Sequence, residues 1–228
     1  MKAAVLALLL AYIPTTASLL KRAAGRSAFA SKTREMTLSG TLVVGGEPAR
    51  HAQLVLRFPL SCRLDVDGGG TLSVKGTADR PAESVEGSSG PALRLLQLAC
   101  PFISYRGLRP DDAEVALRAA AVAQGTDLTA GAALSRLIDR VVYVLGAGPR
   151  DLTRPQLWLY KDTHAPARLL AQGGVDLRLL QYGNPAAADW FPRVLELWLD
   201  GQLAARFESL EARGSRDTSE EEEDDSRE

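Results

Sequence analysis

The sequence is short of the side chains on which catalytic and metal-binding sites depend. Among 228 residues it has 2 His and 2 Cys. His51 and His164 fall in or beside expected turns, with no other His or Cys at metal-ligand spacing. No Gly-x-Ser-x-Gly nucleophile elbow is present. These absences favour binding over catalysis, and we expect no enzyme activity, no metal and no cofactor.

A run of apolar residues long enough to cross a bilayer, about 20 helical residues, is also missing. The run from Ala3 to Ile13 behind Lys2 is shorter and suits the core of a signal peptide. The small residues 15–17 predict cleavage after Ala17. A second small-x-small site at 28–30 fits as well, and a buried N-terminal helix that is never removed is the remaining alternative.

Residues 1–17 are therefore the predicted signal peptide, and the mature protein is expected in the periplasm. No cysteine follows either cleavage site, so lipidation of this protein is not predicted. We expect a monomer without stable membrane insertion.

The charges are distributed unevenly along the chain. Residues 18–210 hold 23 Lys and Arg against 19 Asp and Glu, whereas residues 211–228 hold 3 against 9. The basic residues of the body are scattered among acids, which argues against a nucleic-acid surface. The acidic segment 211–228 has no apolar residue to bury and is expected to be a disordered tail. One domain over residues 18–210 remains.

Cys62 and Cys100 are the two cysteines of the chain. In an oxidising compartment such a pair is a candidate disulfide. Two buried thiols packed as small apolar groups are the alternative, and the sequence leaves both open.

Alternation of apolar and polar residues predicts short strands separated by turns rich in Gly and Pro. Asp200-Gly201 is a strong two-residue hairpin signal. The pattern is typical of an antiparallel meander. The expected strands lie at 36–44, 53–58, 62–66, 72–74, 128–137, 141–145, 156–161, 167–172, 175–182, 191–199 and 203–210.

Helical patterns occur at the start and in the middle of the body. Residues 18–30 form a short amphipathic pattern, and 91–99 begins with Pro91 at a first-turn position. A polar loop precedes it at 81–90. The segment 111–123 opens with two aspartates, which complement the dipole of a helix. The fold class is therefore α+β, mainly β: a large curved antiparallel sheet of about ten strands wrapped around an N-terminal helix and a central helical insertion.

Several late strands are apolar on both faces, at 141–145, 157–160 and 195–199. A sheet that is wet on one side does not need this. Either the sheet wraps a core and is also covered outside, or its concave face lines an apolar cavity.

Six segments of the body carry distinctive strand and turn motifs: Met36–Thr41, Leu54–Pro59, Val141–Ala147, Pro155–Thr163, Pro166–Arg168 and Trp190–Leu197. These motifs resemble those of the outer-membrane lipoprotein-sorting (LolA/LolB-like) family. The resemblance covers roughly residues 18–210. It rests on turn-and-strand patterns, not on catalytic signatures.

The resemblance implies an open, incomplete β-barrel with a helical lid, whose apolar interior holds the acyl chains of lipoproteins or another lipid. It further implies a periplasmic carrier that delivers them towards the outer membrane, with an inner-membrane release complex and an outer-membrane acceptor as partners. Arg57 is the nearest match to a family arginine that contacts the lid. The cavity candidates are Leu54, Leu56, Phe58, Val141, Tyr143, Leu145, Trp158, Leu195, Leu197 and Leu199.

Trp158, Trp190 and Trp198 lie on neighbouring late strands, so at least one is expected to sense the cavity. A second hypothesis is a sensor or regulatory module of the same fold, which reads envelope lipids without moving them. An enzyme is the third, and it would need a polar cluster deep in the cavity.

Overall fold

The computed structural model describes residues 13–25, 33–80, 82–182 and 191–216. In these residues a single antiparallel sheet of 12 strands has the order β5-β4-β3-β2-β1-β12-β11-β10-β9-β8-β7-β6. The strands are β1 (Thr33–Val44), β2 (Arg50–Arg57), β3 (Ser61–Val66), β4 (Gly70–Lys75), β5 (Ser84–Glu86), β6 (Ala133–Leu137), β7 (Arg140–Leu145), β8 (Gln156–Tyr160), β9 (Pro166–Ala171), β10 (Val175–Tyr182), β11 (Pro192–Leu199) and β12 (Gln202–Arg216).

The first and last strands are neighbours in the middle of the sheet, so the meander is open at β5 and β6 rather than at its chain ends. β1 and β12 pair over most of their length, with a register shift at Ser39 and Gly40. A Cβ atom at Gly40 would lie 1.9 Å from the carbonyl oxygen of Glu208. Only glycine allows the two strands to approach this closely.

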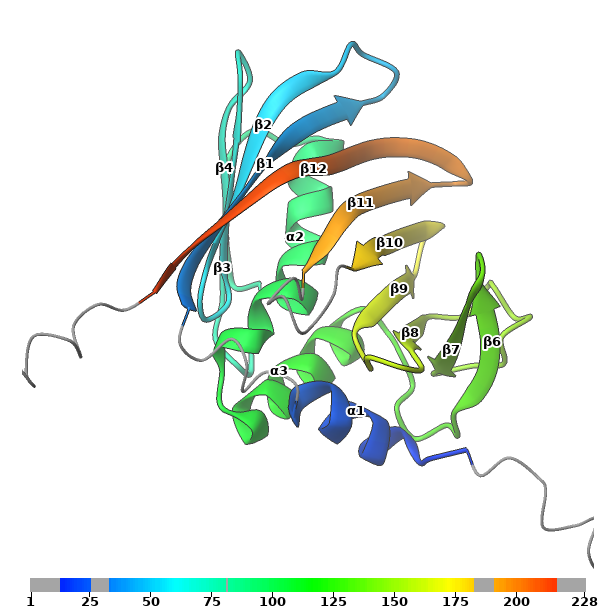
Figure 1. Ribbon diagram of the computed structural model, residues 1–228. Coiled ribbons are helices and arrows are strands. Elements are labelled where there is room, and N and C mark those ends of the chain that lie inside the picture. Colours follow the sequence, from blue (N-terminus) through cyan, green and yellow to red (C-terminus); the bar gives the residue numbers. More distant parts are fainter. Residues whose placement is uncertain (1–12, 26–32, 81, 183–190, 217–228) are drawn as a thin grey trace, which may run out of the picture.

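Three helices occupy the inner side of the curved sheet (Figure 1). They are α1 (Thr16–Gly25), α2 (Pro91–Ser104) and α3 (Pro110–Ala123), with a short 3₁₀ turn, η3 (Tyr105–Gly107), between α2 and α3. Pro91 and Pro110 stand in first-turn positions, and two aspartates follow in the first turn of α3. α2 packs against β2–β4 and β10–β12, whereas α3 packs against α1, α2 and η3. α2 is therefore the helix with the most extensive contact with the sheet.

One large apolar core lies between the inward face of the sheet and the helices. A second, smaller cluster lies on the outward face of the later strands. Its residues are Leu137, Val142, Val144, Trp158, Tyr160, Ala165, Ala167, Leu180 and Val194. The curved, mainly β fold with inner helices confirms the predicted class. Where the late strands are apolar on both faces, the structure shows side chains packed on both sides of the sheet.

Several boundaries differ from the sequence-based ones. β6 covers only 133–137 of the expected 128–137, α1 ends at Gly25, and α2 continues to Ser104. The polar loop expected at 81–90 contains the short strand β5, because its backbone pairs with β4 although its side chains show no apolar alternation. β12 continues to Arg216, since residues 211–216 pair with β1. These six residues belong to the sheet, so the prediction of a disordered tail from 211 was wrong for them. The remainder, 217–228, lies outside the described residues.

α1 begins before the predicted cleavage site. The Thr15 hydroxyl accepts a hydrogen bond from the Ser18 amide (3.2 Å), and the Thr16 hydroxyl donates to the carbonyl of Ala130 (2.8 Å). Leu19 and Leu20 are fully buried in the main core. Cleavage after Ala17 would keep these leucines, whereas cleavage after Ala30 would remove the whole helix. Among the described residues, no helix combines the length and the apolar character needed to cross a membrane.

Candidate functional site

The inward face of the sheet carries most of the predicted cavity residues. Leu54 and Leu56 on β2 and Leu145 on β7 are at most 1% exposed and belong to the main core. Tyr143, Leu195 and Leu197 belong to the same core, and the partly buried Phe58 and Leu199 pack against it. On β2, β7 and β11, the alternate residues that were predicted to point inward therefore do face the helices.

Trp158 and Val141 do not follow this prediction. Trp158 lies in the outward cluster, where its indole N–H donates to the Gln156 side-chain oxygen (2.7 Å). In a strand that is apolar on both faces, the sequence does not show which alternate set of residues faces the core. Val141 is half-buried and belongs to neither cluster.

The expectation that a tryptophan senses the interior was wrong for the two described tryptophans. Trp198 lies on the outward face of β11, on the same side as Glu196 and opposite to the inward Leu197. Trp158 is outward too, and Trp190 lies outside the described residues.

A disulfide joins Cys62 on β3 to Cys100 on α2, with their Cα atoms 5.9 Å apart. The predicted bridge is confirmed. Both cysteines are buried in the main core, so the bond crosses from the inward face of the sheet to the helix that packs on it. It fixes α2 to the early half of the sheet.

Arg57 does not contact a helix. Because Leu54 and Leu56 point inward, Arg57 points outward, and its Nε donates to Glu35 Oε2 (2.7 Å) across β1 and β2. The prediction of a lid contact was therefore wrong. The buried arginine beside the helices is Arg106 in η3, whose guanidinium carbon lies 5.7 Å from the centre of the Tyr105 ring and 5.9 Å from that of Tyr182.

A cavity of about 310 Å³ opens where α2 and α3 meet Asp79, Arg80, Ala82 and Glu83. Its floor includes Leu98, Phe102 and Ala120, which are core residues no more than 3% exposed. Arg94 and Gln97 stand on its α2 side. The apolar core therefore reaches the surface at this point. No signal in the sequence indicated it, because the helix positions that line it come together only through the packing of α2 on α3.

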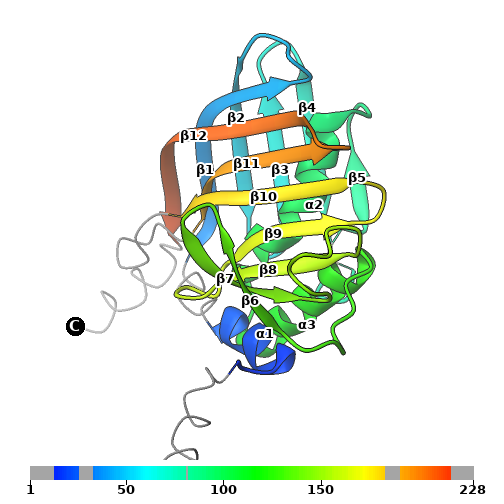
Figure 2. The ribbon, with the colours of Figure 1, turned by 90° about the vertical axis from the view of Figure 1, so that its right-hand side faces the viewer.

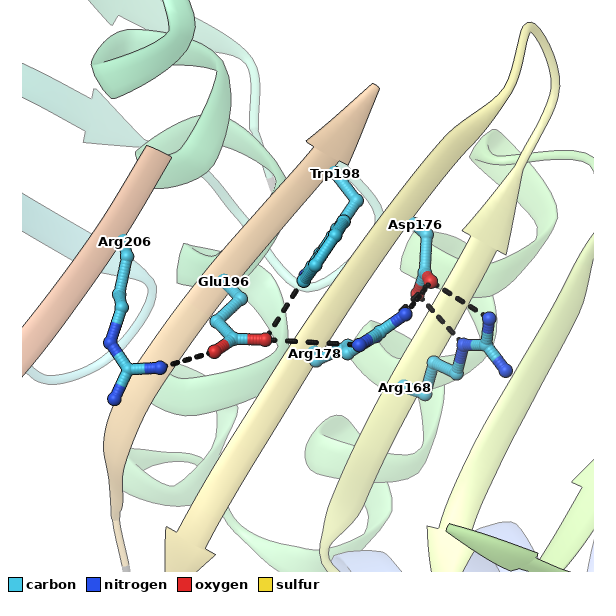
Figure 3. Close-up of polar contacts among 6 residues, drawn as sticks. All are labelled: Arg168, Asp176, Arg178, Glu196, Trp198 and Arg206. Atoms are coloured by element: carbon cyan, nitrogen blue, oxygen red, sulfur yellow. Dashed lines mark hydrogen bonds and ion pairs between the residues drawn. The ribbon is translucent and has the colours of Figure 1, made fainter. Parts of the chain in front are cut away.

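Charged and aromatic side chains form a row across the outward face of β8–β12, which Figure 3 shows in part. Neighbours in the strand register are Trp158 and Arg168, Arg168 and Arg178, Arg178 and Glu196, and Glu196 and Arg206. The strands that carry them run side by side in front of α2 in Figure 2.

Asp176 holds the two adjacent arginines of this row together (Figure 3). Its carboxylate accepts from Nε and Nη2 of Arg168 (both 2.7 Å) and from Nε and Nη2 of Arg178 (3.1 and 2.9 Å). Bidentate charge-assisted pairs of this kind are strong and geometrically specific. One carboxylate thus lies between two cations that would otherwise repel each other across the strands, and it offsets part of their repulsion.

Glu196 makes the next link. It accepts from the Trp198 indole N–H (3.0 Å) and from Arg206 Nη1 (2.5 Å), while the Arg178 guanidinium lies 4.5 Å from the Trp198 ring centre. Each carboxylate of the row is occupied by a guanidinium, so neither is placed to act as a general acid or base. The sequence does contain a signal for this row. On each of the strands β10, β11 and β12, a carboxylate lies two residues from its hydrogen-bond donor: Asp176 and Arg178, Glu196 and Trp198, Glu208 and Arg206. The strand predictions rested on the apolar residues of these strands and not on this spacing.

Burial in the outward cluster also changes the acidity of tyrosines. Desolvation raises the pKa of Tyr160 to about 12, against the opposing effect of the nearby Arg140. Desolvation likewise raises the pKa of Tyr182 well above its usual range. Both phenols are therefore neutral at physiological pH and serve as packing and hydrogen-bonding groups.

The two histidines remain apart. His51 is an exposed residue 3.5 Å from Asp67, and His164 stacks on Tyr143 with ring centres 6.1 Å apart. Within the part of the chain that the structure describes, no group of three or more His, Cys, Asp or Glu could hold a metal ion.

No protein-family model matches the chain, and no curated protein matches its sequence. Solved structures do. A domain assigned to outer-membrane lipoprotein sorting in Vibrio parahaemolyticus is 11% identical and superimposes with a TM-score of 0.51 over 89% of this chain and 94% of that one. A LolA-superfamily protein of Nitrosomonas europaea is 10% identical, with a TM-score of 0.44 over 91% of this chain and 96% of that one. The chain has the fold of the Vibrio domain, an open, curved antiparallel sheet around helices, as the resemblance implied.

Proposed function

We propose that this protein is a periplasmic carrier that binds the acyl chains of lipoproteins, or another lipid, between the inward face of its sheet and its helices. The observation that carries the proposal is the uninterrupted apolar lining of that interface, contributed by α1, α2, α3 and the inward residues of nine strands or more of an open sheet. The similar fold of the Vibrio domain, which is assigned to lipoprotein sorting, supports it.

The energetics suit a carrier. Burial of an acyl chain contributes about 0.8 kcal/mol per methylene group, which gives useful but reversible binding for one chain. A ligand that enters must displace helix side chains from the inward face. The α1–α3 pair is the part that can yield, because α2 is joined to β3 by the disulfide and neither α1 nor α3 contains a cysteine. Delivery to an outer-membrane acceptor would then follow from reversible release.

Export belongs to the proposal. Removal of residues 1–17 would leave the buried leucines of α1 in place, and the mature protein would carry no lipid of its own. The mass of protein isolated from the periplasm tests this part. A first residue of Ser18 is expected, and a chain that starts at Ser31 and still folds would contradict it.

The binding role is tested by native mass spectrometry of protein purified from the periplasm. Bound species with the masses of acyl lipids are expected, and organic extraction should remove them. Leu56 and Arg57 offer a matched pair, because adjacent residues of one strand point to opposite faces. Leu56→Gln is expected to lose the bound lipid and Arg57→Gln to keep it, with near-ultraviolet circular dichroism to verify that both variants fold. Lipid-free wild-type protein, or equal retention by both variants, would overturn the proposal.

A further inference from the structure

The cavity beside α2 has a regular relation to that helix. Arg94, Gln97, Leu98 and Pro101 line it at positions i, i+3, i+4 and i+7, so they form one stripe along the helix, and Phe102 continues it. With a rise of about 1.5 Å per residue, Arg94 and Phe102 are separated by about 12 Å along the axis. The cavity is therefore lined lengthwise by one face of α2.

Polarity changes along this stripe. At the inner end, Leu98 and Phe102 are buried, and the opposite wall on α3 consists of small apolar side chains, Ala119, Ala120 and Ala123. At the outer end stands Arg94, in the first turn of α2, where the dipole of the helix is also positive. The lining thus runs from cationic to apolar over the length of the helix face.

Arg94 is the rim cation that remains available. The other charged groups at the rim are satisfied: Arg80 pairs with Glu83 (2.8 Å), and Asp79 accepts from the Thr77 hydroxyl (2.7 Å). The exposed Arg94 side chain forms no hydrogen bond or ion pair with any residue in the described ranges.

We infer that this cavity binds a single alkyl chain with an anionic head group, carboxylate or phosphate, whose charge lies on Arg94 and whose chain lies along α2 towards Phe102. This inference rests on the proposed function and adds to it a site for one alkyl chain, which lies where α2 and α3 meet and not between the sheet and the helices. A volume of about 310 Å³ is at the lower end of the range for small-molecule sites, about 300 to 1,000 Å³. Such a cavity suits one chain, not the several chains of a complete lipoprotein anchor.

The test is calorimetric titration of the full-length protein with laurate, dodecyl phosphate and dodecanol, which share one alkyl chain and differ in the head group. Two pairs of variants are compared. Arg94→Gln removes the cation at the rim, and Arg22→Gln removes an exposed cation on α1, away from the cavity. Ala123→Trp fills the cavity from its α3 wall, and Val122→Trp adds the same ring at the adjacent exposed position, which does not line it.

We expect wild-type protein to bind at least one of the two anions about tenfold more tightly than dodecanol. The anion that shows this preference identifies the head group. Arg94→Gln should abolish the preference and Arg22→Gln should retain it. Ala123→Trp should weaken the binding of all three ligands at least tenfold, with no change in Val122→Trp. Wild-type affinities that are equal for anions and dodecanol, or effects that are equal within either pair of variants, would overturn the inference.

The same measurements separate this inference from the proposed function. If a lipidated peptide binds the wild-type protein but Ala123→Trp and Arg94→Gln change nothing, the inference fails and the carrier role stands. If no acyl ligand of any kind binds, both fail.

Discussion

The two halves of the sheet are stabilised differently. In the early half, β3 alternates strictly between buried and half-exposed residues, and the exposed ion pair of Arg57 with Glu35 lies on its outward face. In the late half, all five residues of β8 are buried, and the outward face carries its own apolar cluster and the row of paired charges. One half is covered by helices alone, whereas the other is packed on both faces.

If the protein is the proposed carrier, the difference predicts how its interior changes without unfolding. On that proposal, the late strands would keep their outward packing when side chains on the inward face are displaced. The early strands have no such second layer, and the Cys62–Cys100 bond fixes them to α2 instead. The predictions below test this division, from the largest expected effect to the smallest.

Loss of the disulfide should have the largest effect. Replacement of Cys62 and Cys100 by alanine removes a cross-link between residues separated by 38 positions. On the chain-entropy estimate this should lower the free energy of unfolding by about 4 kcal/mol. Urea unfolding of the double variant beside the oxidised wild type measures it. A loss below about 1 kcal/mol would show that the early half is held by packing alone.

Asp176→Asn should have the next largest effect. It removes the anion between Arg168 and Arg178, whose charges then face each other across β9 and β10. Breaking a buried pair by the loss of one partner costs about 3 to 5 kcal/mol, and we expect about 2 to 4 here because Arg178 is partly exposed. The same urea titration serves as the measurement. A loss in the free energy of unfolding below about 1 kcal/mol, as expected for an exposed ion pair, would mean that the row of paired charges does not stabilise the late half of the sheet.

The outward cluster should also make stability depend on alkaline pH. In the folded protein the pKa of Tyr160 is about 12, whereas an unfolded chain has a tyrosine pKa near 10. The unfolded state therefore loses its proton first, so the contribution is complete below pH 10 and declines between pH 10 and 12, by about 2 to 3 kcal/mol in total. Unfolding free energies at pH 9, 10 and 11 should decline less steeply in Tyr160→Phe than in wild type. If the free energy of unfolding changed with pH in the same way in both proteins, the pKa of Tyr160 would not be raised by burial, and the prediction would be wrong.

The smallest effect is expected on the outward face of the early half. Glu35→Gln removes the exposed partner of Arg57 and should change the free energy of unfolding by less than about 1 kcal/mol. Comparison with Asp176→Asn tests the division between the two halves directly. Equal losses in the two variants would contradict it.

Much of this fold could be predicted from the sequence because period-two alternation and turn residues mark most strands. The inward register of Leu38 and Leu42 on β1 followed from that alternation. Two elements could not be predicted in this way. β5 and the end of β12, from 211 to 216, are held by backbone pairing with neighbouring strands, and their side chains carry no apolar pattern.

The site was less predictable for a related reason. Trp158 belongs to a strand that is apolar on both faces, so burial alone could not assign its side. Arg57 was matched to a family pattern, but its position next to the inward Leu56 places it on the outward face beside Glu35. The cavity at Arg94 depends on how α2 meets α3, a tertiary contact that no local pattern encodes.

The measurement that tests the central claim most directly is calorimetric titration of the mature protein with a peptide that carries a diacylglyceryl cysteine, beside the same peptide without its lipid. Calorimetry is preferred to tryptophan fluorescence because Trp158 and Trp198 lie on the outward face. The account predicts saturable binding of the lipidated peptide, with a negative heat-capacity change from apolar burial, and no binding of its unlipidated twin. Equal binding of the two peptides, or binding of neither, would contradict it.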